Sequence, residues 1–184
     1  YMTMCDDYTS FVYKFDAKLN YKERAIKNLD GVLSALLKFY QGTNALTVAM
    51  AQNGDFLGGE KSPDGWATRV MLYRKAMNTF LCSVARPFKF VGRLNEDVNT
   101  YVSIGGRGGL FLTVPNVAII QQPSQKNAGG LTEVYRDFGT YVKSMFAVMY
   151  NPSCVRFAEI GYNLRRLHHM IAWQNTVPKI MSSK

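Results

Sequence analysis

Cysteine is scarce in this sequence, and what there is forms no pattern. Cys5, Cys82 and Cys154 are odd in number and lie far apart in the chain. This spacing argues against a disulfide framework and against a zinc site of the CxxC type. It favours a reducing compartment, and we expect a cytoplasmic protein.

Long apolar runs and a secretory signal are missing as well. The longest apolar runs fall far short of the ~20 residues that a membrane-spanning helix needs. No basic segment is followed by an apolar core and a small-residue cleavage site. The sequence also has no internal repeat, no low-complexity segment and no basic helix or zinc finger that would mark a known DNA-binding motif. A soluble protein without a membrane partner is therefore predicted.

The chain has ample material for a folded core. Its 184 residues are 47% hydrophobic and 13% aromatic, which fits one domain over residues 1–184 and argues against disorder. The opening "YMTMCDDY" begins inside an apolar, strand-like segment. We therefore expect that an upstream portion of the fold is missing.

The net charge is strongly positive. Lys and Arg outnumber Asp and Glu by 22 to 13, a formal charge of +9. Such an excess suits a polyanionic partner, because phosphate contacts supply much of the affinity for nucleic acids. A basic surface that aids solubility explains it equally well, since the charges are spread along the chain.

Hydrophobic periodicity predicts strands interleaved with helices. Apolar residues at helical spacing predict helices over residues 21–40 and 131–149, and Asn95 is suited to cap a short helix that starts near Glu96. Pro115 is expected to limit its strand to a sheet edge or a break. The predicted strands cover residues 1–5, 45–52, 88–92, 110–121, 154–160 and 164–173. The pattern is typical of a mixed α/β sheet flanked by helices.

Two pairs of acids follow predicted strands. Asp6 and Asp7 come after the first strand, and Glu96 and Asp97 come after residues 88–92. Ligand sites in open α/β sheets gather at the carboxyl ends of strands, so we expect both pairs at one rim. Taken singly, each pair is also explained by turn chemistry or by a favourable acid in a helix's first turn, worth ~0.3–1 kcal/mol.

The two histidines are adjacent near the end of the chain. His168 and His169 should point to opposite faces of a strand, so that one can face a site. Imidazole and carboxylate together can bind a divalent cation such as Mn²⁺. A half-buried histidine with hydrogen-bonded nitrogens is the simpler explanation for either one alone.

Two glycine-rich stretches offer backbone that a substrate can approach closely. "FLGG" contains Gly58 and Gly59, and "SIGGRGG" places Arg107 among glycines. A plain loop also explains "FLGG", and a flexible turn between helix and strand is the simpler explanation for "SIGGRGG".

The order of these motifs resembles the glycosyltransferases of the GT-A fold. More specifically, the chain resembles the phage glycosyltransferases associated with TET-like DNA oxygenases. The stretches that carry the resemblance span nearly the whole chain: "CDDYTSFVYKF", "AQNGDFLGG", "GRLNEDVNTY", "GGLTEVYRDFGTYVKSMF" and "LHHMIAWQNTVPKI". It implies a GT-A-like mixed sheet that lacks part of its N-terminal nucleotide-binding half.

The resemblance also implies roles for individual residues. Asp6 and Asp7 would bind the donor, with Asp7 and one of the late histidines holding Mn²⁺ or Mg²⁺ on its diphosphate. Cys5 stands where another acid of the motif is expected, which puts the ribose contact or the metal affinity in doubt. Asp97 would be the general base, with Glu96 beside it to contact or orient the acceptor. Contacts of Gly58, Gly59 and Arg107 with the acceptor complete the set.

The resulting hypothesis is a metal-dependent enzyme of DNA hypermodification. It would transfer a sugar from a nucleotide-sugar donor, expected to be a UDP-sugar, onto a hydroxymethylated pyrimidine such as 5-hydroxymethylcytosine in DNA. The setting would be the cytoplasm of a bacterium infected by the phage. The alternatives are a metal-dependent nuclease or nucleotidyltransferase that uses the four acids as a two-metal cluster, and a nonenzymatic DNA-binding or scaffold domain.

Overall fold

The computed structural model describes residues 1–5, 7–16, 18, 20–52, 70–122, 131–139, 141–161 and 165–178. The chain divides into two compact units, which are described separately. The sheet unit comprises Tyr1–Phe88, Gly109–Gln122 and Ser182–Lys184, and the helical unit comprises Lys89–Gly108 and Pro123–Met181. That residues 1–184 act as a single domain stays a prediction.

The sheet unit is built on a six-stranded mixed sheet with the strand order β1-β5-β4-β6-β2-β3. Its strands are β1 (Met2–Met4), β2 (Tyr8–Phe15), β3 (Tyr21–Ala25), β4 (Thr47–Gln52), β5 (Thr79–Cys82) and β6 (Phe111–Gln121). Strands β4 and β6 pair in parallel, and the other neighbours pair antiparallel. The prediction of a mixed α/β fold is therefore confirmed. β2 was missed in the sequence, and β1 lies at the sheet edge with Thr3 and Met4 exposed.

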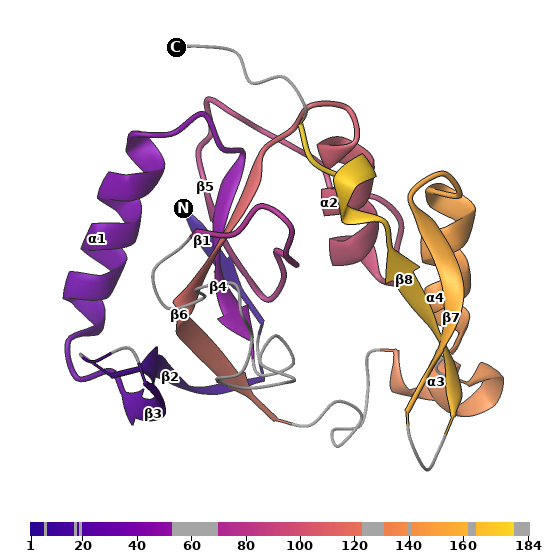
Figure 1. Ribbon diagram of the computed structural model, residues 1–184, viewed down its shortest axis with the longest axis horizontal. Coiled ribbons are helices and arrows are strands. Elements are labelled where there is room, and N and C mark those ends of the chain that lie inside the picture. The colour runs from indigo at the N-terminus through magenta and orange to yellow at the C-terminus, as the bar shows by residue number, and fades with distance from the viewer. Residues whose placement is uncertain are drawn as a thin grey trace. The chain divides into compact units, whose positions relative to one another are not determined.

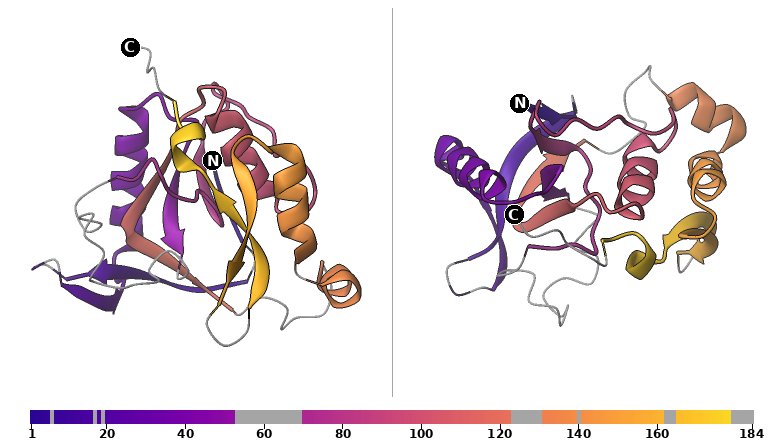
Figure 2. Two further views of the ribbon diagram at one scale, coloured as in Figure 1. Left: turned by 45° about the vertical axis from the view of Figure 1, so that its right-hand side comes forward. Right: turned by 90° about the horizontal axis from the view of Figure 1, so that it is seen from above.

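Helix α1 (Leu29–Gln41) packs along one face of this sheet (Figures 1 and 2). The side chain of Asn28 caps it by accepting a hydrogen bond from the Gly31 N–H at 2.9 Å. Val32, Leu36 and Tyr40 recur every four residues and are buried in one cluster with side chains of β4 and β6. The predicted start of this helix at Tyr21 was wrong, because residues 21–25 pair with β2 and form a strand instead.

Pro115 lies in a central strand and not at an edge. β6 runs between β4 and β2, so the edge prediction was wrong. The predicted break is present, because Met50 pairs with Val114 whereas the next residue, Ala51, pairs with Ala118. Proline has no N–H to donate to a neighbouring strand. Because of this register shift, residue 115 has no pairing partner in β4 that would require such a hydrogen bond.

Residues 88–92 do not form the predicted strand. They lie outside the described strands, and the Val91 N–H donates to the hydroxyl of Thr100 at 2.8 Å. A helix side chain therefore takes the place of a ladder partner. As a result, the acidic pair Glu96–Asp97 does not follow a strand, and the reasoning that placed it at the sheet rim loses its premise.

The helical unit combines short helices with a β-hairpin. Its elements are α2 (Glu96–Gly105), α3 (Thr132–Phe138), α4 (Tyr141–Tyr150), β7 (Val155–Ile160), β8 (Arg166–Ile171) and the 3-10 turn η3 (Trp173–Asn175). The two predicted late strands are confirmed as an antiparallel pair, which packs against α4. The predicted continuous helix over residues 131–149 was wrong. Gly139 has a φ of +79°, which breaks the helical path between α3 and α4.

Candidate active site

The rim of the sheet unit carries Asp7. β1 is antiparallel to β5, and β5 is antiparallel to β4, so β1, β4 and β6 all run in the same direction. Their carboxyl ends therefore meet at one rim, where Asp7 lies between the end of β1 and the start of β2. This is the place where open α/β sheets bind ligands. Asp6, the other predicted donor-binding acid, lies outside the described residues.

Asp7 is fixed by hydrogen bonds from the end of β6. Its Oδ1 accepts from Gln121 Nε2 at 2.9 Å, and its main-chain oxygen accepts from the Gln122 N–H at 3.1 Å. Both partners are more than a hundred residues away in sequence. The carboxylate is thus held in place by the sheet and does not depend on its own loop alone.

Cys5, which stands where the resemblance expects an acid, is a neutral neighbour of Asp7. Burial raises the pKa of the Cys5 thiol to about 11, with further contributions from a hydrogen bond to Asp7 and from its charge. The thiol therefore stays protonated at neutral pH. In this protonation state it adds no negative charge to the rim.

A complete metal site is not assembled within the part of the chain that the structure describes. No group of three or more His, Cys, Asp and Glu side chains there is arranged to hold an ion. Mg²⁺, however, usually keeps several waters and binds through one or two carboxylates plus substrate phosphates. Asp7 at the rim fits that minimal role.

The acidic pair lies at the start of α2. Asp97 is half-buried, and its Oδ1 accepts a hydrogen bond from the Val98 N–H at 2.7 Å, whereas Glu96 is exposed. Asn95 precedes the helix as predicted, but it has a left-handed φ of +57° and makes no side-chain cap hydrogen bond. Local helix geometry thus places the Asp97 carboxylate at the positive end of the helix dipole.

Tyr135 of α3 lies within electrostatic reach of this pair. Burial raises the pKa of its phenol, and the charges of Glu96 and Asp97 raise it further. The Nζ of Lys143, from α4, lies 5.9 Å from the centroid of the Tyr135 ring. The acids of α2 therefore lie near the neutral phenol of Tyr135, whose ring in turn faces the ammonium group of Lys143.

The histidines are close together on β8. His168 and His169 are both half-buried, and their ring centroids are 4.2 Å apart, which is closer than side chains on opposite faces of a regular strand. The expected opposite orientation was therefore wrong. The Nδ1 of His169 lies 3.4 Å from the hydroxyl of Ser144, which is fully buried. Asp7 belongs to the other unit, and a metal ion shared with either histidine stays a prediction.

Arg107 follows α2 in the helical unit and is exposed. It lines a cavity of about 700 Å³ together with polar side chains that include Ser103, Asn151 and Asn175. Contact with an acceptor is sterically open to it. Gly58 and Gly59, predicted to share that contact, lie outside the described residues.

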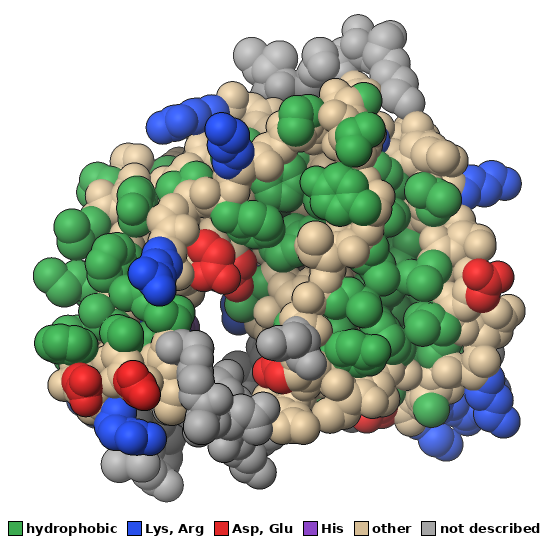
Figure 3. Space-filling view, turned by 180° about the vertical axis from the view of Figure 1, so that it is seen from behind, with side chains coloured by type: hydrophobic (Ala, Val, Ile, Leu, Met, Phe, Trp, Pro, Cys, Tyr) green, Lys and Arg blue, Asp and Glu red, His purple; other side chains and the backbone are tan. Residues whose placement is uncertain are grey.

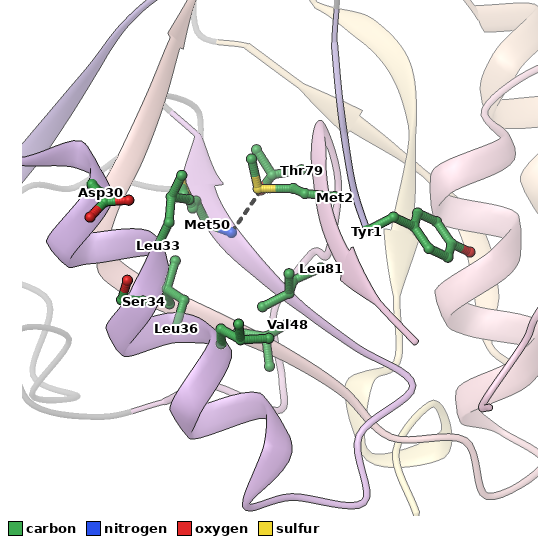
Figure 4. Close-up of a pocket in the computed structure, with 11 residues that line it drawn as sticks. Tyr1, Met2, Asp30, Leu33, Ser34, Leu36, Val48, Met50, Thr79 and Leu81 are labelled. Carbon is green, nitrogen blue, oxygen red and sulfur yellow. Dashed lines mark hydrogen bonds between the residues drawn. The ribbon is translucent and has the colours of Figure 1, made fainter. Parts of the chain in front are cut away.

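A second cavity, of about 350 Å³, lies between α1 and the strands β1, β4 and β5 (Figure 4). Aliphatic side chains such as Leu33, Leu36, Val48 and Leu81 face one another across it, and Asp30 is its charged lining residue. A nucleoside diphosphate needs cations or several hydrogen-bond donors around its phosphates. This cavity therefore does not suit the donor.

The described Lys and Arg side chains form no single basic patch on the face seen in Figure 3. Its Lys and Arg side chains are scattered among apolar and neutral ones. This agrees with the even spread of positive charge along the sequence. Among the described helices, none is both long enough and apolar enough to cross a membrane.

Some site residues were missed in the sequence. Gln121 and Gln52 each end an apolar strand at the rim, so the rule that selected Asp7 would also have selected them. Nothing in the sequence indicated that Tyr135 belongs to the site, because it falls at a regular apolar position of the helix predicted over residues 131–149. Only the packing of α3 reveals that it neighbours the acids.

Comparison with known families gives one match. The model of a family described as TET-Associated Glycosyltransferase matches residues 1–130. The match includes Asp7, Glu96, Asp97 and Arg107, and it ends before the histidines. No curated protein and no solved structure matches the chain.

This match decides between the enzyme classes that the sequence left open. It supports glycosyl transfer over a nuclease, a nucleotidyltransferase or a nonenzymatic DNA-binding domain. Such a glycosyltransferase implies a nucleotide-sugar donor and activity on DNA bases. Since residues 1–130 are well over half of the 184 residues, the chain belongs to the TET-associated glycosyltransferase family.

Proposed function

We propose that this enzyme transfers a sugar from a UDP-sugar onto the hydroxymethyl group of a modified pyrimidine, such as 5-hydroxymethylcytosine, in DNA. The observation that carries the proposal is the family match, because it spans both Asp7 and Asp97. The net charge of +9 supports a polyanionic acceptor. The cytoplasm of a phage-infected bacterium is the setting in which we expect the reaction.

Asp7, together with Asp6, would hold the donor diphosphate through Mn²⁺ or Mg²⁺. The position of Asp7 at the carboxyl ends of β1, β4 and β6 supports this role. Such an ion, when bound, neutralises negative charge on the leaving diphosphate. His168 or His169 would add an imidazole ligand, as the resemblance to GT-A enzymes implies.

Asp97 would act as the general base. Its carboxylate takes the proton of the acceptor hydroxyl while the hydroxyl oxygen forms a bond to the anomeric carbon. The bond from that carbon to the diphosphate oxygen breaks, and the nucleoside diphosphate leaves with the electron pair. Half-burial shields Asp97 from water more than exposed Glu96, which favours Asp97 as the base and Glu96 as the orienting group. Arg107, Gly58 and Gly59 would contact the acceptor.

The test is a comparison of Asp97→Asn with Asp7→Asn. Asp97→Asn keeps the shape and polarity of the side chain but cannot accept the proton, so transfer should fall by ~10²–10⁴-fold. Its affinity for UDP-sugar and Mn²⁺, measured by calorimetry, should stay the same. Asp7→Asn should instead weaken that affinity.

Glu96→Gln is the matched control, and it should reduce transfer much less than Asp97→Asn. If Asp97→Asn left transfer unchanged while Glu96→Gln abolished it, the two roles would be exchanged. If neither variant changed transfer while both stayed folded, the pair would only stabilise the start of α2. The general-base assignment would then be wrong.

A further inference from the structure

A chain of hydrogen-bonded amide side chains leads away from Asp7 along the rim of the sheet. Gln121 Nε2 donates to Asp7 Oδ1 at 2.9 Å. Asn78 Nδ2 then donates to two acceptors, Gln121 Oε1 at 2.5 Å and Gln52 Oε1 at 2.7 Å. Gln52 Nε2 points to Met77 Sδ at 3.1 Å. Asp7, Gln121, Asn78 and Gln52, which we call the amide chain, thus link the ends of β6 and β4 with the start of β5.

The direction of every hydrogen bond in the amide chain follows from the carboxylate at its end. An ionised carboxylate only accepts, so Gln121 must turn its NH₂ group toward Asp7 and its carbonyl toward Asn78. Asn78 must then present its NH₂ group, whose two hydrogens match two glutamine carbonyls. Each amide is therefore oriented by its neighbours, and aligned hydrogen bonds of this kind polarise and strengthen one another.

Asn78 is held in an uncommon backbone conformation at the centre of the amide chain. Its φ is +67°, in the left-handed region that non-glycine residues adopt rarely and asparagine more readily than most. Its main-chain oxygen accepts a hydrogen bond from the Cys5 N–H at 2.9 Å. Asn78 therefore restrains Asp7 twice, through Gln121 on the side-chain path and through Cys5 on the main-chain path.

We propose that Gln121 and Asn78 are positioning residues for the donor site, and that the amide chain holds the Asp7 carboxylate in the orientation in which it receives the metal-bound diphosphate. This inference rests on the proposed role of Asp7. Without the Gln121 donor, the carboxylate is free to rotate, and its affinity for the ion falls. Partners of this kind, which orient a ligating side chain, typically contribute 10–100-fold to metal affinity or activity.

The test measures a gradient along the amide chain. Gln121→Met keeps the length of the side chain but donates no hydrogen bond, and it should weaken Mn²⁺ and UDP-sugar binding by roughly 10–100-fold in calorimetry. Asn78→Gly keeps the positive φ but removes the side chain, and it should have a smaller effect. Gln52→Met, three hydrogen bonds from Asp7, should have the smallest. KM for the donor should rise in the same order, with little change in kcat at saturating donor and metal.

Thermal unfolding and Asp7→Asn separate the possible outcomes. The three variants could lose stability equally while their Mn²⁺ and UDP-sugar affinities show no decrease in effect from Gln121 to Gln52. The amide chain would then be only structural, and the inference would be overturned. Binding within about twofold of the parent in Gln121→Met would also overturn it, and if Asp7→Asn still lost donor binding the proposed function would stand. If Asp7→Asn kept full donor affinity, the proposed role of Asp7 itself would fail. Should Gln121→Met not fold, Gln121→Leu is measured instead, since it too donates no hydrogen bond to Asp7, and it should weaken binding by a similar factor.

Discussion

The two acids on which the proposed chemistry depends are held in opposite ways. In the sheet unit, the side chain that donates to Asp7 is 114 residues away, at the far end of β6. In the helical unit, the N–H that donates to Asp97 belongs to the next residue. The hydrogen bond from Gln121 to Asp7 can therefore form only when the sheet is assembled, whereas the hydrogen bond from Val98 to Asp97 can form as soon as α2 does.

This difference predicts how each acid responds to changes elsewhere in the molecule. A mutation that loosens the sheet should misplace Asp7 even when the rim residues are intact. The local hydrogen bond of Asp97 should persist as long as the first turn of α2 is helical. Mutations in each unit, followed by measurements of unfolding, test whether the two units lose their structure independently.

The largest effect is expected from Gly105→Ala in the helical unit. A Cβ at this position would lie 2.1 Å from the main-chain oxygen of Thr176, where backbone and not a flexible side chain must move. Overpacking of this kind costs ~1–3 kcal/mol and occasionally more, and we expect the upper end or beyond. Hydrogen exchange followed by mass spectrometry should show lost protection in α2 and α4, with β4 and β6 unchanged.

Gly106→Ala is the matched control for that change. Its Cβ would meet the Asn175 and Val102 oxygens at 3.3 Å, and its φ of −61° suits any residue. Its effect should stay within ~1 kcal/mol. If Gly105→Ala also removed protection from β4 and β6, the two units would unfold together, and the comparison between them would break down.

A smaller effect is expected in the sheet unit from Thr79→Val. The buried hydroxyl of Thr79 accepts a hydrogen bond from the Met50 N–H at 2.8 Å, and valine would leave that N–H without a partner. An unsatisfied buried donor costs about 1–3 kcal/mol, which chemical denaturation would measure.

Thr47→Val is the control, since Thr47 is equally buried but is contacted there by the Cys82 thiol at 3.8 Å, a weak donor. It should cost less than about 1 kcal/mol. Equal costs for the two threonines would contradict the assignment of the Met50 hydrogen bond as the stabilising contact.

The smallest changes in the free energy of unfolding are expected when one ion pair in each unit is broken. Lys14 and Glu23 meet at 2.6 Å with the lysine side chain only 3% exposed, whereas Arg165 and Glu159 are 3.4 Å apart and both well exposed. Glu23→Gln removes one negative charge from beside a buried ammonium group and should cost about 1–2 kcal/mol, between the values for surface and buried pairs.

Glu159→Gln should change the free energy of unfolding by less than ~0.5 kcal/mol. A salt titration should reduce the difference between Glu159→Gln and the parent before it affects Glu23→Gln, since buried pairs are screened less. The reverse order would mean that exposure does not govern these pairs.

Much of the fold was predictable because its signals are local. The helical spacing of Val32, Leu36 and Tyr40 and the apolar runs of β4, β6, β7 and β8 predicted their elements correctly. Errors occurred where pairing overrides local pattern. Residues 21–25 were assigned to a helix but pair with β2, and residues 88–92 alternate like a strand but bond to Thr100. Gly139 broke a helix whose apolar period continues across it.

The sequence by itself determined the residue types on which the chemistry depends, because carboxylates, histidines and glycines can be recognised without coordinates. It also determined the family, through motifs within residues 1–130. Only the tertiary structure decided which side chains surround those acids. Gln121 meets Asp7, and Tyr135 approaches Glu96 and Asp97, through contacts between elements far apart in the chain. The physical reason is that one long-range hydrogen bond leaves no periodic trace in the sequence, whereas the burial of a whole helix face or strand does.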